Sequence, residues 1–517
     1  MNKAIHRIAG LIMAVVMILG TIINTKAAGS DYYVSLTGSD TNPGTASAPF
    51  KTFAKANSVL TPGSTLYIYA GIYKQPLKIT KSGTSTEQIT VQPLGGKAVI
   101  DLQYRAIPGV EIRASYVTVK GLVVRKIRDV CVNLKGANLT VSELVISGCT
   151  SHGISVNHSV QIRILNSRVS RAVQSNHSRT LTSGWGSGIK VRLSKNVLIQ
   201  GNTIYHNFGE GIGTRGTNII IRGNTVFDNY SVNIYTNSQN VSIERNFVYC
   251  TPNSGYERNG LPAVGISLAE EYFAGWGARL KNARVLNNIV AFCKNGVRYA
   301  GAGEGVLGGG LKSATIAYNT LYGSINAALS IVYESAQSGS TIANNIIWQA
   351  QNNLTAIDNP IGLTFHNNLW KVAPPAAFRG PGDQYGDPEF AGTPAYTPES
   401  YRLSSSSPAI RAGADTGIFQ DFYAKPRGPE FDIGAIQFTD PVTVSPTPTL
   451  IEPTNTLSPA TAQVTPSPTP VSEQPTSASM PDTSALVLST ASPTIPAQPA
   501  QPSQEIVYDN TYCFPLF

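Results

Sequence analysis

A pattern of about 22 residues recurs through the middle of the chain and restricts the folds that it can adopt. In its clearest copies an apolar residue stands three positions before an asparagine, as in Ile221-x-x-Asn224 and Ile243-x-x-Asn246. We call the position three residues after this apolar residue the ladder position. It is asparagine at Asn202, Asn224, Asn246, Asn288, Asn319, Asn345 and Asn368. Short apolar strands that return at a fixed long period predict a solenoid of about ten stacked coils, each hydrogen-bonded to the next.

A second apolar strand, often written Gly-Ile, repeats in step with the first, at Ile154, Ile189, Ile212 and Ile234. Two strands per repeat predict an all-β chain whose successive coils pair with one another along both strands. Regular recurrence of asparagine favours a structural role over a functional one. We therefore expect the ladder side chains to lie inside, bonded to the backbone and to their copies in the coils above and below.

The N-terminus has the composition of an export signal. Lys3 and Arg7 precede an apolar run over residues 8–23, and Thr25 and Ala27 follow it. This order predicts a secretory signal peptide over residues 1–28, with an uncleaved membrane anchor as the alternative. We expect a secreted or cell-surface protein with no membrane span once the signal is removed.

The chain changes composition after residue 440. Among the 64 residues of 441–504, 14 are Pro, 12 Thr and 10 Ser, which predicts a disordered linker. A short C-terminal remnant follows over 505–517, so the β-helix domain is expected over 29–440. The whole chain has a net charge of +9, yet residues 441–517 contain five acids and no base, so the predicted domain is basic and suits an anionic partner.

The five cysteines are too few for a disulfide scaffold. Cys149, Cys250 and Cys293 fall at similar places in the repeat, which favours buried apolar packing. A Cys250–Cys293 bridge between neighbouring coils is the alternative in an exported protein. Cys513 stands alone in the tail.

Both ends of the predicted domain resemble a known family. The opening Tyr32-Tyr33-Val34-Ser35, Gly38-Ser39-Asp40 and Asn42-Pro43-Gly44-Thr45, followed by Pro49-Phe50-Lys51-Thr52, is similar to the start of family 9 pectate lyases. The repeat resembles the right-handed parallel β-helix of pectate-lyase-like proteins from residue 31 to about residue 438. Ser407-Pro408-Ala409-Ile410 and Asp432-Ile433-Gly434-Ala435 resemble the end of many bacterial members, although Arg411 stands where those commonly carry Asp.

Near the start of the domain, Phe50, Phe53, Ala54 and Leu60 lie at helical spacing. We expect them to form a short helix that caps the first coil.

Candidate site residues lie on and beside the Gly-Ile strand. Side chains next to the inward Ile point outward, which places Lys190 and Arg192 beside Arg215 and Tyr235. His152 and Glu210 stand two places before their Ile, whereas His206 and Asp228 share a coil position 22 residues apart. Breaks in the period predict loops at 171–188, 250–263, 269–281 and 300–312. The candidates are catalytic Lys190, Arg215, Glu210, Arg192 and His152, and substrate-binding Trp185, Tyr235, Trp276, His206 and Asp228.

These residue types suit elimination from a uronate, which needs a neutralised carboxylate, a base for the C5 proton and an acid for the leaving oxygen. Lys or Arg can act as the base, and Arg or Ca²⁺ can neutralise the carboxylate. Family 9 pectate lyases hold Ca²⁺ with several Asp. At the matching places this chain retains Glu210 alone as a candidate ligand, and Lys190 is the nearest match to the family's catalytic Lys.

The sequence therefore predicts a polysaccharide lyase acting on an acidic, pectate-like polysaccharide, as a monomer and without a nucleic-acid partner. Two rivals stay open. The charged patch is also typical of a solvated face, which favours a β-helix that only binds glycans or serves as an adhesive stalk. Trp185 and Trp276 can equally anchor their own loops.

Overall fold

A computed structural model describes residues 29–105, 108–182, 184–271, 280–302, 310–332, 337–349, 356–357 and 359–439. These residues belong to one compact unit, Met1–Thr443. The expected signal peptide, linker and C-terminal remnant lie outside the described residues, as does Trp276. None of the helices in the described ranges has the length and apolar character needed to cross a membrane.

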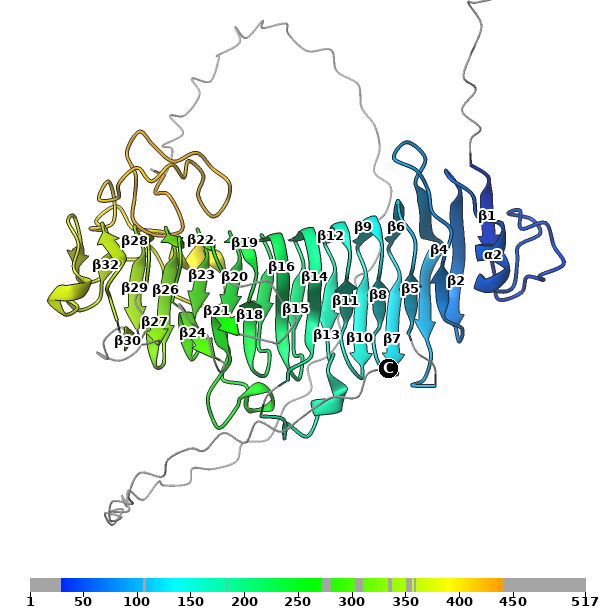
Figure 1. Cartoon of the computed structure of the whole chain (residues 1–517), viewed down its shortest axis with the longest axis horizontal. Helices are drawn as coiled ribbons and strands as arrows, with labels where there is room; N and C mark the ends of the chain where they lie inside the picture. The colour runs from blue at the N-terminus through cyan, green and yellow to red at the C-terminus, as the bar shows by residue number, and fades with distance from the viewer. Residues whose placement is uncertain are drawn as a thin grey trace, which may run out of the picture. The chain divides into compact units, whose positions relative to one another are not determined.

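The described chain winds into parallel coils with three faces, and every strand pairs with strands one coil away (Figure 1). Four long strands turn a corner and contribute to two faces each. These are β2 (Thr65–Tyr73), β4 (Ile89–Asp101), β14 (Ser187–Gln200) and β16 (Glu210–Arg222).

The first face precedes the asparagine ladder. Besides parts of β2, β4, β14 and β16, it contains β1 (Asp31–Val34), β6 (Val117–Lys120), β9 (Ala137–Ser142), β12 (Val160–Leu165), β19 (Gln239–Glu244), β22 (Arg284–Leu286), β25 (Thr315–Ala317), β28 (Ser340–Ala343) and β31 (Leu363–His366).

The second face follows the ladder. Besides the ends of β2 and β4, it contains β7 (Val123–Ile127), β10 (Val145–Cys149), β13 (Arg168–Ser170), β15 (Thr203–Tyr205), β17 (Thr225–Phe227), β20 (Phe247–Tyr249), β23 (Ile289–Ala291), β26 (Thr320–Ser324), β29 (Ile346–Gln349), β32 (Leu369–Trp370) and β33 (Gln384–Tyr385).

The third face contains the Gly-Ile strands. Together with the first halves of β14 and β16, it consists of β3 (Leu77–Ile79), β5 (Val110–Ile112), β8 (Val132–Leu134), β11 (Ile154–Asn157), β18 (Val232–Thr236), β21 (Val264–Glu271), β24 (Asn295–Ala302), β27 (Ala327–Val332) and β30 (Ala356–Ile357). The inward Ile154, Ile189, Ile212 and Ile234 pair in one register and are fully buried. The predicted parallel β-helix is confirmed.

The asparagine ladder is internal, as predicted. Asn202 Nδ2 donates to Asn224 Oδ1 at 3.0 Å, and Asn224 Nδ2 donates to Asn246 Oδ1 at 3.0 Å. Each amide also donates to a backbone carbonyl, for example Asn224 Nδ2 to Ile199 O at 2.9 Å. The side chains thus satisfy buried polar groups at the turn between the first and second faces.

A second internal ladder lies at the turn between the second and third faces, and the sequence analysis missed it. Asn207 Nδ2 donates to Asn229 Oδ1 of the next coil at 2.8 Å, and Asn229 Nδ2 donates within its own coil to Asn233 Oδ1 on β18 at 2.9 Å. The signal was present, because Asn207 and Asn229 are 22 residues apart.

The capping helix is α2 (Phe53–Val59), and Thr52 caps its N-terminus by accepting from Lys55 N at 3.1 Å. Phe50, Phe53 and Leu60 are buried as predicted, whereas Ala54 is exposed. Ala56 takes the expected place of Ala54, because three residues beyond Phe53 is one helical turn on the same face. Four one-turn 3₁₀ helices complete the described elements: η1 (Gln174–Asn176), η2 (Ser254–Tyr256), η3 (Ala376–Phe378) and η4 (Pro398–Tyr401).

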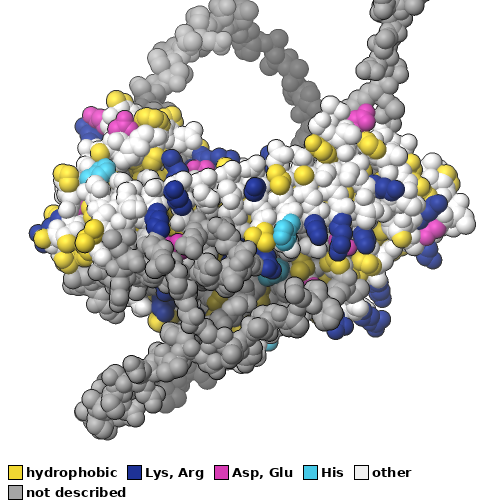
Figure 2. All heavy atoms as spheres, in the orientation of Figure 1, with side chains coloured by type: hydrophobic (Ala, Val, Ile, Leu, Met, Phe, Trp, Pro, Cys, Tyr) yellow, Lys and Arg dark blue, Asp and Glu magenta, His cyan; other side chains and the backbone are white. Residues whose placement is uncertain are grey.

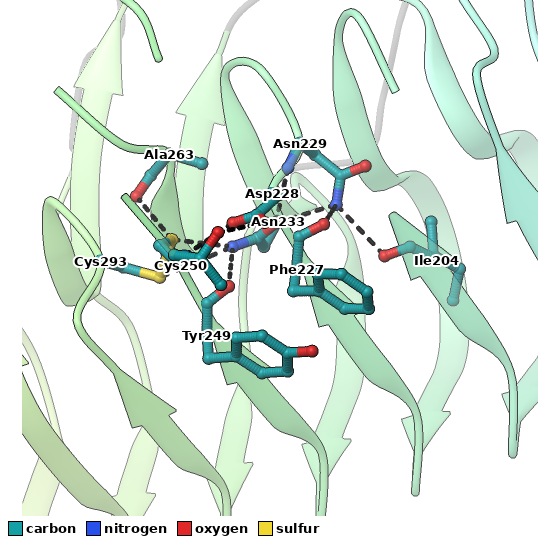
Figure 3. The surroundings of a disulfide bond; sticks show 10 residues. Ile204, Phe227, Asp228, Asn229, Asn233, Tyr249, Cys250, Ala263 and Cys293 are labelled. Carbon is teal, nitrogen blue, oxygen red and sulfur yellow. Dashed lines mark hydrogen bonds between the residues drawn. A yellow bond between two sulfur atoms is a disulfide. The ribbon is translucent and has the colours of Figure 1, made fainter. Parts of the chain in front are cut away.

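The four cysteines in the described part of the chain form disulfides, so the expectation of unpaired apolar packing is wrong. Cys131 bonds Cys149, and Cys250 bonds Cys293, the pairing given as the alternative. In each case the coil repeat brings two turns of neighbouring coils within reach. Figure 3 shows the second bond with the Asn233 amide beside it, 3.3 Å from Cys250 Sγ. This disulfide joins the turn that begins the loop at 251–262 to the next coil.

The segment after β33 folds back against the turns that follow the first face (Figure 1). Arg427 holds it there. Its guanidinium donates to Asn287 Oδ1 at 2.9 Å and to Ala435 O at 2.9 Å, and lies over the ring of Tyr318 at 4.2 Å. Burial lowers the pKa of Arg427 to about 10.

Candidate functional site

The candidate site lies on the third face, where consecutive coils place Lys190 next to Glu210. Register pairs Ser187 with Glu210 and Lys190 with Gly213. Lys190 Nζ donates to Glu210 Oε2 at 3.1 Å, and Ser187 Oγ donates to the same oxygen at 2.6 Å. The side chain of Lys190 is 13% exposed and that of Glu210 is 5% exposed. A buried carboxylate therefore holds one partly buried ammonium.

Gly213 makes this arrangement possible. A Cβ at that position would lie 2.1 Å from Glu210 Oε2, 2.6 Å from Ser187 Oγ and 3.1 Å from Lys190 Nζ. The carboxylate thus fills the space that any larger residue would need. Gly213 stands at the same coil position as Lys190, so the sequence contained this signal, but its meaning depends on the direction of the Glu210 side chain.

His152 supports the pair from the preceding coil. Ser187 N donates to His152 Nδ1 at 3.1 Å, so this nitrogen carries no proton. Burial, with the charge of Lys190 beside it, lowers the pKa of His152 to about 3. A neutral imidazole consequently fixes the backbone of Ser187, whose hydroxyl in turn orients Glu210.

Two arginines extend the site along the next outward row. Register pairs Arg192 with Arg215 across neighbouring coils. Partial burial, together with the charge of Arg215, lowers the pKa of Arg192. The ring of Tyr235 lies 5.9 Å from Lys190 Nζ and 5.9 Å from the Arg215 guanidinium carbon. Like charges held this close favour an anion between or above them.

Two of the predicted loops join beside this face. Arg179 donates to Ser254 O at 2.9 Å, and Arg258 donates to Thr182 O at 3.2 Å. Trp185 packs edge-on against Tyr230, with ring centroids 5.6 Å apart. The guanidinium carbon of Arg258 lies over the Trp185 ring, 4.9 Å from its centroid. These contacts show that Trp185 anchors its own loop, which was one of its two predicted roles.

Further positive charge lies on and beside the third face, from Arg258 in the joined loops, from Arg298 on β24 and from Lys294 just before that strand. Burial and the charge of Arg258 lower the pKa of Arg298, and burial followed by the charges of Arg298 and Arg258 lowers the pKa of Lys294. Lys294 and Arg298 were not among the site residues predicted from the sequence. Arg298 was detectable, since it follows an inward Val297 as Lys190 follows Ile189. Figure 2 shows Lys and Arg side chains spread across the visible face of the coils.

His206 and Asp228 form a separate cluster at the turns that precede the third face. His206 Nε2 is 3.7 Å from Asp228 Oδ2, and the His206 ring stacks on Tyr256 with centroids 4.5 Å apart. Thr251 Oγ1 donates to Asp228 Oδ2 at 2.6 Å. The residues are adjacent as the shared coil position predicts, but their contacts tie them to the loop at 251–262 and not to Lys190.

The donors present do not fit a Ca²⁺ site. Calcium takes six to eight oxygen ligands, usually several of them carboxylates. Glu210 already accepts from Ser187 and Lys190, and the next outward positions on these two strands carry Arg192 and Arg215. In the described ranges no three His, Cys, Asp or Glu side chains come together as a possible metal-binding group.

Family models match most of the coils. Residues 32–242 match the "Pel9A-like, right handed beta helix region", and residues 177–347 match the "Right handed beta helix region".

Individual proteins match shorter stretches. The uncharacterized protein YwoF of Bacillus subtilis is 31% identical over 163 residues, covering 29% of this chain and 34% of that protein. Pectate lyase PEL9 of Emericella nidulans is 37% identical over 82 residues, covering 16% of this chain and 20% of that protein. The chain thus matches about a third and about a fifth of the length of these relatives.

Among solved structures, the crystal structure of pectate lyase Pel9A superposes with a TM-score of 0.49 and 17% identity, covering 79% of this chain and 96% of that one. The family models, together with the coils described above, show that the chain is a right-handed parallel β-helix protein, and over residues 32–242 it is similar to the Pel9A-like family.

Proposed function

We propose that this protein is a polysaccharide lyase that cleaves an acidic polysaccharide by β-elimination. The observation that carries the proposal is the convergence of Lys190, Arg192 and Arg215 on one face, with Glu210 as the carboxylate that holds Lys190 in place. The sequence similarity to a protein named pectate lyase gives further support. An excess of bases over acids suits a carboxylated substrate and does not suit a hydrolase that works with two carboxylates.

Each side chain has a defined part in the proposed reaction. Arg192 and Arg215 bind the uronate carboxylate and stabilise the charge that develops when the neighbouring C–H bond breaks. The Lys190 amine accepts the C5 proton, the electron pair of that bond forms the C4–C5 double bond, and the C4–O bond breaks. The leaving oxygen then takes the proton from the Lys190 ammonium. Glu210, Ser187 and His152 act on the reaction only by positioning Lys190.

Neutralisation of the substrate carboxylate is assigned to arginine and not to Ca²⁺, because the donors around Glu210 do not fit that ion. Addition of a chelator should therefore leave turnover within about twofold. We place the reaction outside the cell or on its surface, where acidic polysaccharides occur. The proposed active form is a monomer.

Product analysis tests the proposal. Purified protein is incubated with polygalacturonate, alginate or a glycosaminoglycan, and the unsaturated uronate product is followed by its ultraviolet absorbance. Lys190→Ala should lower the rate by roughly 10²–10⁴-fold, as for loss of an essential proton-transfer group. Lys195→Ala, on the same strand but exposed, serves as the control. Full activity of both Lys190→Ala and Arg215→Ala would rule out this site.

A non-catalytic glycan-binding role is the second candidate, and one observation favours it. Lys190 Nζ already donates to the buried carboxylate of Glu210 at 3.1 Å, and an ion pair of this kind can hold a fixed positive charge for binding an anionic chain. Binding of polyuronides without any unsaturated product, lost in Arg192→Ala and Arg215→Ala, would establish this role in place of the lyase.

A further inference from the structure

A shallow groove of about 500 Å³ runs along the first face, away from the outward rows of the third face that carry Lys190. It crosses β14, β16, β19 and β22. A neighbouring depression of about 310 Å³ continues it toward β12 and β9 and shares Asn196 and Leu198 with it. Together they form a track parallel to the axis along which the coils stack.

One side of the groove is an exposed asparagine ladder, distinct from the two internal ones. Asn218 Nδ2 donates to Asn196 Oδ1 at 3.0 Å, Asn240 Nδ2 to Asn218 Oδ1 at 3.0 Å, and Asn282 Nδ2 to Asn240 Oδ1 at 2.8 Å. A primary amide has two N–H donors and two acceptor lone pairs. Each inner member of the ladder therefore keeps one N–H and one lone pair for a ligand.

The residues on the floor of the groove differ in type from the other outward residues of the first face. Outward positions of the first face are mostly threonine, at Thr90, Thr118, Thr140, Thr315, Thr341 and Thr364. In the groove this row reads Leu198, Ile220, Ser242 and Arg284, and Ile220 is 37% exposed. The left-handed backbone at Asn218, with φ of 56°, explains why asparagine is favoured there. It does not explain two apolar side chains on an open face.

The charges of the lining restrict the ligand. None of the described residues that line the groove or the depression is acidic, and the basic ones are Arg163 and Arg284. Four coil steps separate them, which is roughly 19 Å at about 4.8 Å per step. Between them a ligand meets only amides, a serine and aliphatic carbon. A chain with a carboxylate on every sugar would find no partner charge there.

We propose that this groove binds a neutral, linear polysaccharide lying along the coil axis. The repeated amides would bond its hydroxyl groups, and Leu198 and Ile220 would pack under the C–H faces of the sugars. The assignment does not depend on the reaction proposed for the third face.

Affinity electrophoresis of the full-length protein in gels containing xylan, galactan or mixed-linkage glucan tests the proposal. At least one neutral polymer should retard the wild-type protein. Ile220→Arg, which fills the groove, and Asn218→Gly, which removes the amide but tolerates the left-handed backbone, should each weaken retardation about tenfold or more. Thr341→Arg, on the same outward row outside the groove, and Lys190→Ala should be retarded as the wild type. Melting curves identify any variant that fails to fold. If one of Ile220→Arg and Asn218→Gly does not fold, the retardation of the other tests the proposal.

Three outcomes would overturn the proposal. One is that no neutral polymer retards the wild-type protein. Another is that Ile220→Arg and Asn218→Gly are retarded as strongly as the wild type. The third is that sedimentation shows a self-association abolished by Ile220→Arg, which would make a second copy of the chain the occupant.

Discussion

The carboxylate of Glu210 reaches back one coil to the ammonium of Lys190, with 3.1 Å between Oε2 and Nζ. The two residues are 20 positions apart in the chain, close to one coil period. Their contact therefore depends on coil length as much as on side-chain chemistry. A residue inserted between them would shift the register and separate the charges.

Gly213→Ala should disrupt this contact without touching either charge. The added methyl group would meet Glu210 Oε2 at 2.1 Å, so the carboxylate must turn away and Lys190 loses its partner. We expect turnover, or polyuronide binding, to fall at least tenfold, and the melting temperature to fall as well. Ser155→Ala, in the same outward row two coils earlier, is the matched control and should change neither quantity. Wild-type behaviour of Gly213→Ala would contradict the described position of Glu210.

Asn224→Leu tests the internal ladder. The substitution removes the donor to Ile199 O and the acceptor for Asn202 N, both buried. Leaving such groups without partners costs about 1–3 kcal/mol in the free energy of unfolding. Denaturant titration should show this loss, whereas Ser242→Ala on the outward row should show none. Equal midpoints for wild type and Asn224→Leu would mean that the ladder does not stabilise the coils.

The depressed pKa of His152 predicts acid sensitivity. In the folded protein this pKa is about 3, below the ordinary value of 6.5, so between these values the unfolded chain binds a proton that the folded chain does not. Stability is therefore unaffected by this group above pH 6.5 and decreases progressively as the pH falls below it. Unfolding midpoints measured from pH 7 to pH 4 should fall less in His152→Gln than in the wild type. The exposed His158→Asn should follow the wild-type curve.

Removal of all residues after Asp440 should leave the unfolding transition of the β-helix unchanged. The Pro/Ser/Thr-rich composition of 441–504 offers little apolar surface that could pack on the coils. Calorimetry of the truncated and full-length proteins measures this directly. A clearly lower melting temperature of the truncated protein would show that the tail stabilises the domain.

The repeat period predicted most of the fold and the central part of the site. Because Ile189 and Ile212 occupy one coil position, their neighbours Lys190 and Glu210 had to lie in adjacent coils. Contacts made by loops could not be predicted in this way. The position of Arg258 over Trp185 depends on where two loops of irregular length meet, and no period relates them.

Other contacts depend on how the turns between strands are arranged in space, which the repeat period alone does not predict. Cys131 and Cys149 are 18 residues apart, which is not a coil period, yet the turns of neighbouring coils bring them together. His206 and Asp228 are in register as expected, but their side chains leave the turn on the side of Tyr256. Coil position fixes where a residue stands and not the direction in which a turn residue points.

The stacking of the third face has a consequence for durability. Strands β14, β16 and β18, which carry Lys190, Glu210 and Tyr235, are the fifth, sixth and seventh of the eleven described strands that run from β3 to β30. In a solenoid each coil is supported mainly by its two neighbours, so opening starts at the ends and moves inward. Several outer coils can therefore fray and re-form while these three strands keep their geometry.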